Sequence, residues 1–318
     1  MAAQGGSKRV IYAALAGNLL IAATKFGAAF VTGSSSMLSE GVHSLVDTGN
    51  EVLLLHGLRR AEKQPDRAHP LGYSREVYFW SFIVALLVFA LGAGVSFYEG
   101  VSHLRHPEPI QNIAVNYVVL GISVLFEGAA WTVALRQFRK EKGNFGYLAA
   151  IRRSKDPTTF TVLFEDTAAL TGLLIAFVGI TAAEFFSMPA LDGLGSIGIG
   201  IVLALTAVML ARESKGLLLG EAALPDVQSQ ILGIVAREPA IQRTNGVLTV
   251  HLGPRDIVVA LSAEFRDELS TTEIEACVER LEQQLRREIP EIGALFIKPQ
   301  TAAGWAAAQR RVSGERPA

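Results

Sequence analysis

The run VYFWSFIVALLVFALGAGVSFY, residues 77–98, contains no charged side chain. A helix needs about 20 consecutive apolar residues to cross the hydrocarbon layer of a bilayer, and this run is long enough. A second charge-free run extends from Gly193 to Ala211. Only 19% of the 318 residues are charged and 50% are hydrophobic, whereas a soluble domain of this length normally carries more charge. The sequence therefore predicts an integral membrane protein.

Similar apolar runs recur on both sides of residues 77–98. Six membrane spans are predicted: Val10–Val31, Met37–Leu58, Val77–Tyr98, Ile113–Leu135, Thr159–Ala182 and Leu191–Ala211. The N-terminal residues lack the features of a cleaved signal peptide, so we expect the first run to be retained as a span. The expected fold class is an all-α six-helix transmembrane bundle over residues 1–213, followed by a small α+β cytosolic C-terminal domain.

The connections between the spans differ in their content of basic residues. The two long connections, 59–76 and 136–158, are rich in Lys and Arg, whereas the short connections Thr32–Ser36 and Phe185–Ala190 have none. Basic loops stay on the cytoplasmic side, which places the long connections and both termini in the cytoplasm. An even number of spans agrees with this topology. We expect a multi-pass protein of the bacterial inner membrane.

The character of the sequence changes after Glu213. Residues 214–299 are predicted to form the cytosolic α+β domain, in which Ser270 and Glu273 make a capping box at the start of a helix. The other predicted elements are a helix at Val227–Arg237 and strands at Val247–Leu252, Ile257–Phe265 and Ala294–Ile297. The tail, residues 300–318, is expected to be disordered.

The second predicted span carries four ionisable residues, Glu40, His43, Asp47 and Glu51. Their spacings of 3, 4 and 4 place them on one helical face. Ionisable groups are costly in lipid and tend to face the interior of a bundle, where they serve function. His43 and Asp47, one turn apart, can direct an imidazole nitrogen and a carboxylate at one divalent metal ion. The alternative is that the two form a structural hydrogen-bonded pair.

The fifth predicted span carries Glu165 and Asp166. Adjacent residues lie about 100° apart on a helix, so one can bind a metal ion while the other orients a ligand or takes a proton. Alternatively, both pair with Lys25 of the first span or cap polar atoms of neighbouring helices. Glu127 and Asp192 are expected to serve in relay, capping or packing. Asn18 shares a face of the first span with Lys25, which is expected to snorkel outward or to neutralise a carboxylate.

Several classes of function are disfavoured by composition. A net charge of −1 argues against a nucleic-acid-binding protein. The single cysteine, Cys277, excludes an intramolecular disulfide and a cysteine-based metal cluster. The sequence has no His-Glu-x-x-His motif and no second histidine near His43 on its helix, which argues against an intramembrane metalloenzyme. We expect neither enzymatic activity nor a resident cofactor.

Three motifs occur in an order that matches this topology: EGVHSLVD at residues 40–47, DRAHPLGY at 66–73 and LLLG at 217–220. Together with six spans and a small soluble domain, they resemble the cation diffusion facilitator family. That resemblance implies a divalent metal transporter, with zinc as its substrate. It also implies proton-coupled antiport out of the cytosol by alternating access, and a homodimer in which the soluble domain takes part.

The resemblance also assigns metal ligands to His43, Asp47 and Asp166. The family's remaining ligand falls on Val162, so that Glu165, Glu40 or water must complete the set. The segment FEDTAA, residues 164–169, is similar to a divergent subgroup with mitochondrial and bacterial members. The metal-binding histidines of the family's soluble domain are missing, so we expect no tight metal site there. Transport of manganese, iron or cobalt, or metal sensing without transport, remain alternatives.

Overall fold

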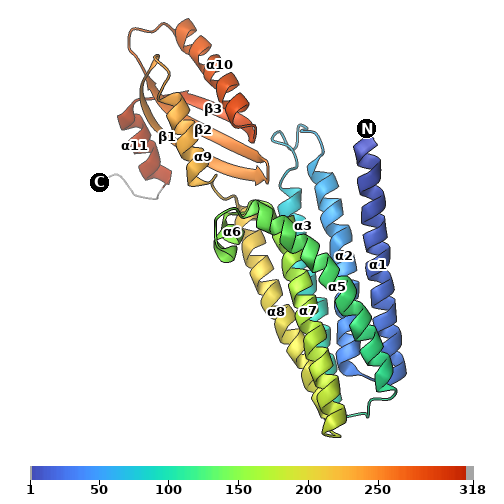
Figure 1. Ribbon diagram of the computed structural model, residues 1–318. Coiled ribbons are helices and arrows are strands. Elements are labelled where there is room, and N and C mark those ends of the chain that lie inside the picture. The colour runs from blue at the N-terminus through green and yellow to red at the C-terminus, as the bar shows by residue number, and fades with distance from the viewer. Residues whose placement is uncertain (1, 313–318) are drawn as a thin grey trace. The chain divides into compact units, whose positions relative to one another are not determined.

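The computed structural model describes residues 2–312, which Figure 1 draws in colour from blue to red. By their internal contacts the residues form two compact units. The first comprises Met1–Arg60 and Glu76–Lys215, and the second comprises Ala61–Arg75 and Gly216–Ala318. The connection 61–75 thus groups with the C-terminal unit, which the predicted division after residue 213 did not anticipate.

The first unit is made of helices, which confirms a helical transmembrane domain. The α3, η1 and α4 segments run on without a break, and η1 is a single π-helical stretch. The helices that begin in this unit are α1 (Ala2–Thr32), α2 (Ser35–Ala61), α3 (Glu76–Leu87), η1 (Val88–Ala93), α4 (Gly94–Arg105), α5 (Ile113–Glu141), α6 (Tyr147–Arg153), α7 (Pro157–Phe185) and α8 (Ala190–Leu219). The short helix α6 was not predicted.

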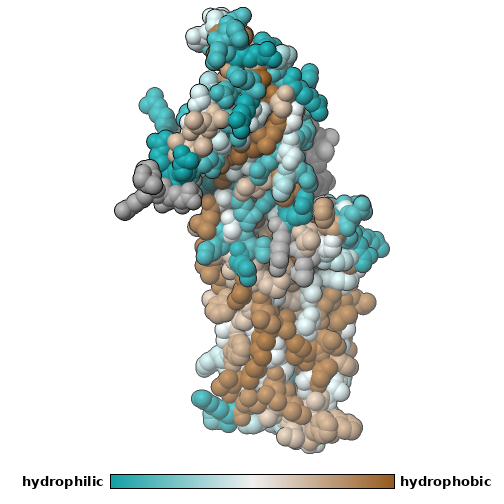
Figure 2. All heavy atoms as spheres, turned by 90° about the vertical axis from the view of Figure 1, so that its left-hand side faces the viewer, coloured by the Kyte–Doolittle hydropathy of each residue, from teal (hydrophilic) through white to brown (hydrophobic). Residues whose placement is uncertain are grey.

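Among the described residues, four helical segments are long and apolar enough to cross a membrane: Glu76–Arg105, Ile113–Lys140, Phe160–Phe185 and Ala190–Leu219. The α1 helix contributes a shorter apolar stretch, Asn18–Thr32, within the residues described in full. Large apolar side chains such as Leu125, which is 74% exposed, cover the outside of the bundle. Figure 2 shows hydrophobic side chains over the helical unit and mostly hydrophilic ones over the other unit. An apolar outer surface is what lipid contact requires.

One end of the bundle is held together by the carboxylate of Asp192, at the start of α8. The backbone N–H of Ser35 donates to Asp192 Oδ2 at 2.6 Å, and that of Ser36 donates to Oδ1 at 3.3 Å. Ser34 Oγ donates to the same carboxylate at 3.1 Å. The first N–H groups of a helix have no partner within it, and a negative charge there is favourable. Of the three roles considered for Asp192, the structure supports capping.

The α4 and α8 helices approach too closely for side chains between them. A Cβ atom added to Gly100 would lie 2.7 Å from the carbonyl oxygen of Gly193. A Cβ atom on Gly193 would in turn lie 3.0 Å from the carbonyl oxygen of Gly100. Small residues allow such close backbone packing, which stabilises helix pairs in membranes where the hydrophobic effect is absent.

The second unit is an α+β domain, as predicted. Its elements are α9 (Pro225–Val235), β1 (Ile241–Gly253), β2 (Asp256–Phe265), α10 (Thr271–Glu288), β3 (Ile292–Pro299) and α11 (Ala302–Val312). The strands form one sheet in the order β1-β2-β3. β1 and β2 are antiparallel neighbours, whereas β2 and β3 are parallel and are joined through α10. Ile231, Val259 and Leu281 are among the residues of its core.

The predicted capping box opens α10. The Ser270 hydroxyl accepts from the backbone N–H of Glu273, and Glu273 Oε2 accepts from the backbone N–H of Ser270 at 2.8 Å. These hydrogen bonds favour the charged carboxylate and lower the pKa of Glu273. Cys277, Leu281 and Leu285 are buried on the inner face of α10.

The connection 61–75 is folded around Asp66. Its carboxylate accepts from the Tyr73 hydroxyl at 2.6 Å and from the backbone N–H of His69 at 2.8 Å, which lowers the pKa of Asp66. Ser74 Oγ donates to Asp256 Oδ2 at 2.6 Å and fastens the connection to β2.

The expectation that the tail is disordered is wrong for residues 302–312, which form α11. A Cβ atom on Gly246 would lie 2.9 Å from the Trp305 ring, so this aromatic side chain packs directly on β1. Tertiary contact stabilises an Ala-rich segment whose sequence shows no clear hydrophobic period. The rest of the predicted tail, residues 313–318, lies outside the described residues.

The close contact of α4 with α8 gives a first prediction. Gly100→Ala should destabilise the bundle by about 1–3 kcal/mol, because the added methyl group overpacks the contact with Gly193. Gly121→Ala is the matched control, since no atom of the described residues lies within 4 Å of its Cβ position on α5. Denaturation of the purified protein in detergent measures both. Equal stability of the two variants would contradict the close contact.

Candidate metal centre

The polar stripe of α2 faces the interior of the bundle, as its spacing predicts. His43 is buried, and its Nδ1 lies 3.3 Å from Asp47 Oδ1. Neither ring nitrogen of His43 has a hydrogen-bond partner in the part of the chain that the structure describes, and neither does Asp47 Oδ1. Leaving a buried imidazole without hydrogen bonds is costly. A contact of 3.3 Å between His43 and Asp47 is compatible both with two ligands of one metal ion and with a structural pair.

A small cavity brings Asp47 together with both predicted residues of α7. Its volume is about 30 Å³. A site needs about 10–15 Å³ to hold one water molecule, so this cavity has room for an ion. The residues that line it are Asn18, Ser44, Asp47, Glu51, Glu127, Val162, Glu165 and Asp166. We call it the acidic cavity.

The acidic cavity carries five carboxylates, contributed by α2, α5 and α7. Asp166 Oδ2 is buried without a hydrogen-bond partner among the described residues. His43 is not one of the lining residues, but it contacts Asp47, which is. Carboxylates gathered at membrane depth repel one another, and a bound cation offsets that repulsion. The charge and size of the cavity therefore suit a small cation.

Lys25 does not pair with Glu165 or Asp166, the alternative considered for the fifth span. Its ammonium group lies 3.0 Å from Glu40 Oε2, donates to Ser44 Oγ at 2.7 Å and lies 3.6 Å from Glu127 Oε1. Lys25 and Glu40 are both fully buried. Of the two protein groups considered for the missing ligand, Glu40 is thus neutralised by Lys25 and lies outside the acidic cavity, which favours Glu165.

Asn50 has a role that sequence reasoning missed. Its Nδ2 donates to Glu165 Oε1 at 2.7 Å and links α2 to α7. Asn50 lies three residues after Asp47 and seven after His43, so it extends the same stripe. The spacing could have revealed it, but an uncharged amide attracts less notice in a span than a carboxylate does. Asn18 similarly donates to Glu51 Oε1 at 2.8 Å.

The candidate metal ligands of the acidic cavity are not arranged around a single point in the structure described. Among residues 2–312 with described side chains, no group of three His, Cys, Asp or Glu residues is placed to hold a metal ion. Val162 lines the cavity with carbon where the family resemblance leads one to expect a ligand.

Comparison with known proteins agrees with this architecture. The family model of the cation efflux transmembrane domain matches residues 11–219. The mitochondrial proton-coupled zinc antiporter SLC30A9 of Homo sapiens is 34% identical over 250 residues, which are 78% of this chain and 44% of that protein. Metal tolerance protein C4 of Arabidopsis thaliana is 32% identical over 265 residues, or 83% of this chain and 58% of that protein.

A bacterial relative matches over nearly its whole length. The cation-efflux pump FieF of Klebsiella pneumoniae is 26% identical over 290 residues, which are 88% of this chain and 91% of that protein. By contrast, the chain spans about half the length of the first two relatives. The extent of the family match, together with the helical bundle and its acidic cavity, shows that the chain belongs to the cation efflux family of membrane transporters.

Proposed function

We propose that the protein exports a divalent metal ion, zinc in the first place, through the acidic cavity in exchange for protons. The observation that carries this proposal is the cluster of five carboxylates between membrane helices, next to the buried His43. The names of the human relative, a proton-coupled zinc antiporter, and of the bacterial relative, a cation-efflux pump, support the same function.

The proposed ligands are His43, Asp47, Asp166 and Glu165. One imidazole with several carboxylates suits zinc, which accepts nitrogen and oxygen donors in a tetrahedral arrangement. Glu165 is positioned by Asn50 and supplies the donor that Val162 lacks. The same donors would also admit manganese, iron or cobalt, so the preference for zinc rests on the relatives' names.

Proton exchange follows from the chemistry of these ligands. Imidazole and carboxylate must be deprotonated to bind a metal ion, so metal binding releases protons and proton binding releases metal. In an alternating-access cycle, one conformation would take the ion from the cytosol and a second would release it on the other side. Gathering the separated donors of α2 and α7 around the ion would couple binding to the change of conformation.

The proposed orientation has both termini and the second unit in the cytoplasm. Its support is the concentration of Lys and Arg in the connections that follow α2 and α5, compared with the uncharged turn between α1 and α2. With this orientation in a bacterial inner membrane, the direction of transport is out of the cytosol.

We further propose that the protein is a homodimer in which the second unit takes part. Leu248, Ala260 and Phe296 are neighbours across the three strands, and Leu248 and Phe296 are 47% and 59% exposed. An apolar row of this kind on an open sheet face is suited to contact with a second copy.

Reconstitution tests the proposed function. The purified chain in sealed vesicles, with a pH gradient across the membrane, should move zinc against the proton flow. Manganese, iron(II) and cobalt in parallel vesicles establish the substrate range. Zinc binding without flux would identify a metal sensor and contradict the transporter.

His43 and Asp47 give a second prediction. His43→Ala and Asp47→Ala should each weaken zinc affinity by about tenfold or more and abolish flux, because each removes a donor. His56→Ala is the control, since His56 lies on the same helix but packs edge-on against Trp80. Calorimetry measures affinity, and the vesicle assay measures flux. If either variant transported normally, its residue would not be a ligand.

A third prediction separates two roles for Glu165. If Glu165 is a ligand, Glu165→Gln should weaken zinc binding and flux together, and this is the outcome we expect. If Glu165 only carries the counter-proton, the variant should bind zinc normally but no longer respond to the pH gradient. Glu184→Gln, on an exposed part of the same helix, is the matched control. Unchanged affinity, flux and pH response would make Glu165 a structural residue.

A further inference from the structure

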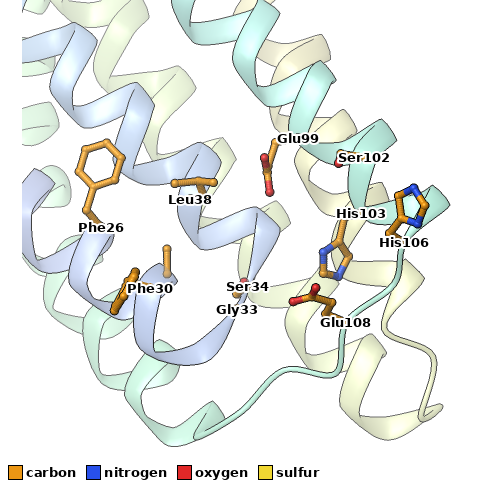
Figure 3. Close-up of a pocket in the computed structure, with 11 residues that line it drawn as sticks. Phe26, Phe30, Gly33, Ser34, Leu38, Glu99, Ser102, His103, His106 and Glu108 are labelled. Carbon is orange, nitrogen blue, oxygen red and sulfur yellow. The ribbon is translucent and has the colours of Figure 1, made fainter.

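A second polar pocket lies at the end of the bundle that contains the α1–α2 turn, away from the acidic cavity. Its volume is about 530 Å³. One wall is apolar and includes Phe26, Phe30 and Leu38. The opposite wall is formed by the last turns of α4 and the loop that follows, and carries Glu99, His103, His106 and Glu108. In Figure 3 the Glu99 and Glu108 carboxylates and the His103 ring point into the space facing Gly33 and Ser34.

His103 is the unusual residue of this pocket. Its side chain is only 7% exposed, and its Nε2 has no hydrogen-bond partner among the described residues. Its position is fixed by the packing of α4 against α8, where a Cβ atom on Gly193 would lie 3.2 Å from His103 Cβ. Most buried polar atoms in proteins are hydrogen-bonded, so an unpartnered imidazole nitrogen that faces a pocket calls for an occupant.

The surrounding side chains supply suitable chemistry. Glu99 and His103 are one turn apart on α4, and His106 follows as the C-cap residue of this helix. No hydrogen bond or ion pair is formed by the Glu99 or Glu108 carboxylate within residues 2–312 as described. A wall of two carboxylates repels anions, and a lipid chain would leave the His103 nitrogen unsatisfied. Imidazole beside carboxylate is a donor set for divalent metal ions.

We propose that this pocket is a second divalent-metal site, in which His103 binds together with Glu99 or Glu108 and water completes the shell. The donors do not form a group of three placed around one point. The site therefore keeps water ligands and binds the ion with lower affinity than a closed structural site. Lower affinity suits an ion that is bound transiently and then released. Binding at this pocket stands independently of the acidic cavity. Only its use as a station for an exported ion rests on the proposed function.

The test uses a protein in which two proposed ligands of the acidic cavity have been substituted. In the full chain carrying His43→Ala and Asp47→Ala, purified in detergent, equilibrium dialysis should still detect bound Zn²⁺. Adding His103→Ala should weaken this remaining binding by about tenfold or more, since a nitrogen ligand is lost. Glu99→Gln has the same shape as the native residue, so it provides a second variant if His103→Ala does not fold.

Two histidines outside the pocket serve as controls. His56→Ala, on α2, and His69→Ala, beside Asp66 in the second unit, should leave the remaining zinc binding unchanged. The proposal would be overturned if the doubly substituted chain bound no zinc, or if His69→Ala rather than His103→Ala removed it. Unchanged affinity in folded His103→Ala and Glu99→Gln would overturn it equally. Failure of zinc flux in the unsubstituted chain would instead refute the proposed function.

Discussion

A carboxylate inside a lipid bilayer must be paired, hydrated or bound to a cation, because the hydrocarbon core offers it no hydrogen bonds. The helical unit is organised around this constraint. Where a carboxylate serves the fold, a partner from another helix satisfies it. Asp192 accepts from the backbone N–H groups of α2, and Glu40 Oε2 is paired with the ammonium group of Lys25.

In the acidic cavity, Glu51, Glu127 and Glu165 follow that rule through Asn18, Lys25 and Asn50, whereas Asp47 and Asp166 keep buried oxygens that no described residue hydrogen-bonds. Asp47 Oδ1, Asp166 Oδ2 and both nitrogens of His43 are buried atoms without hydrogen-bond partners among the described residues. These atoms belong to three of the four proposed ligands, His43, Asp47 and Asp166. Asn50 joins α2 to α7, because its Nδ2 donates to Glu165 Oε1. Asn50 makes no hydrogen bond to the second carboxylate oxygen, Glu165 Oε2.

Much of this could be predicted from the sequence, and the reasons differ between elements. The spacing of Glu40, His43 and Asp47 determines a helical face, so their common orientation follows from geometry. The capping box at Ser270 is a local pattern and was predicted correctly. The Lys25–Glu40 pair and the Asn50–Glu165 hydrogen bond join separate helices, and no local pattern reveals such contacts. The α11 helix depends on Trp305 packing against Gly246, which is likewise a tertiary effect. The assignment of metal ligands remains a prediction.

The central claim is that one imidazole and several carboxylates of the acidic cavity bind zinc. X-ray absorption spectroscopy of the zinc-loaded protein measures the donor atoms directly, after the pocket near His103 has been removed by His103→Ala. The account predicts a zinc shell with one imidazole nitrogen, oxygen atoms for the rest and no sulfur. It further predicts that the nitrogen contribution disappears in His43→Ala. A shell with two or more imidazoles, or a nitrogen contribution that persists without His43, would contradict the account.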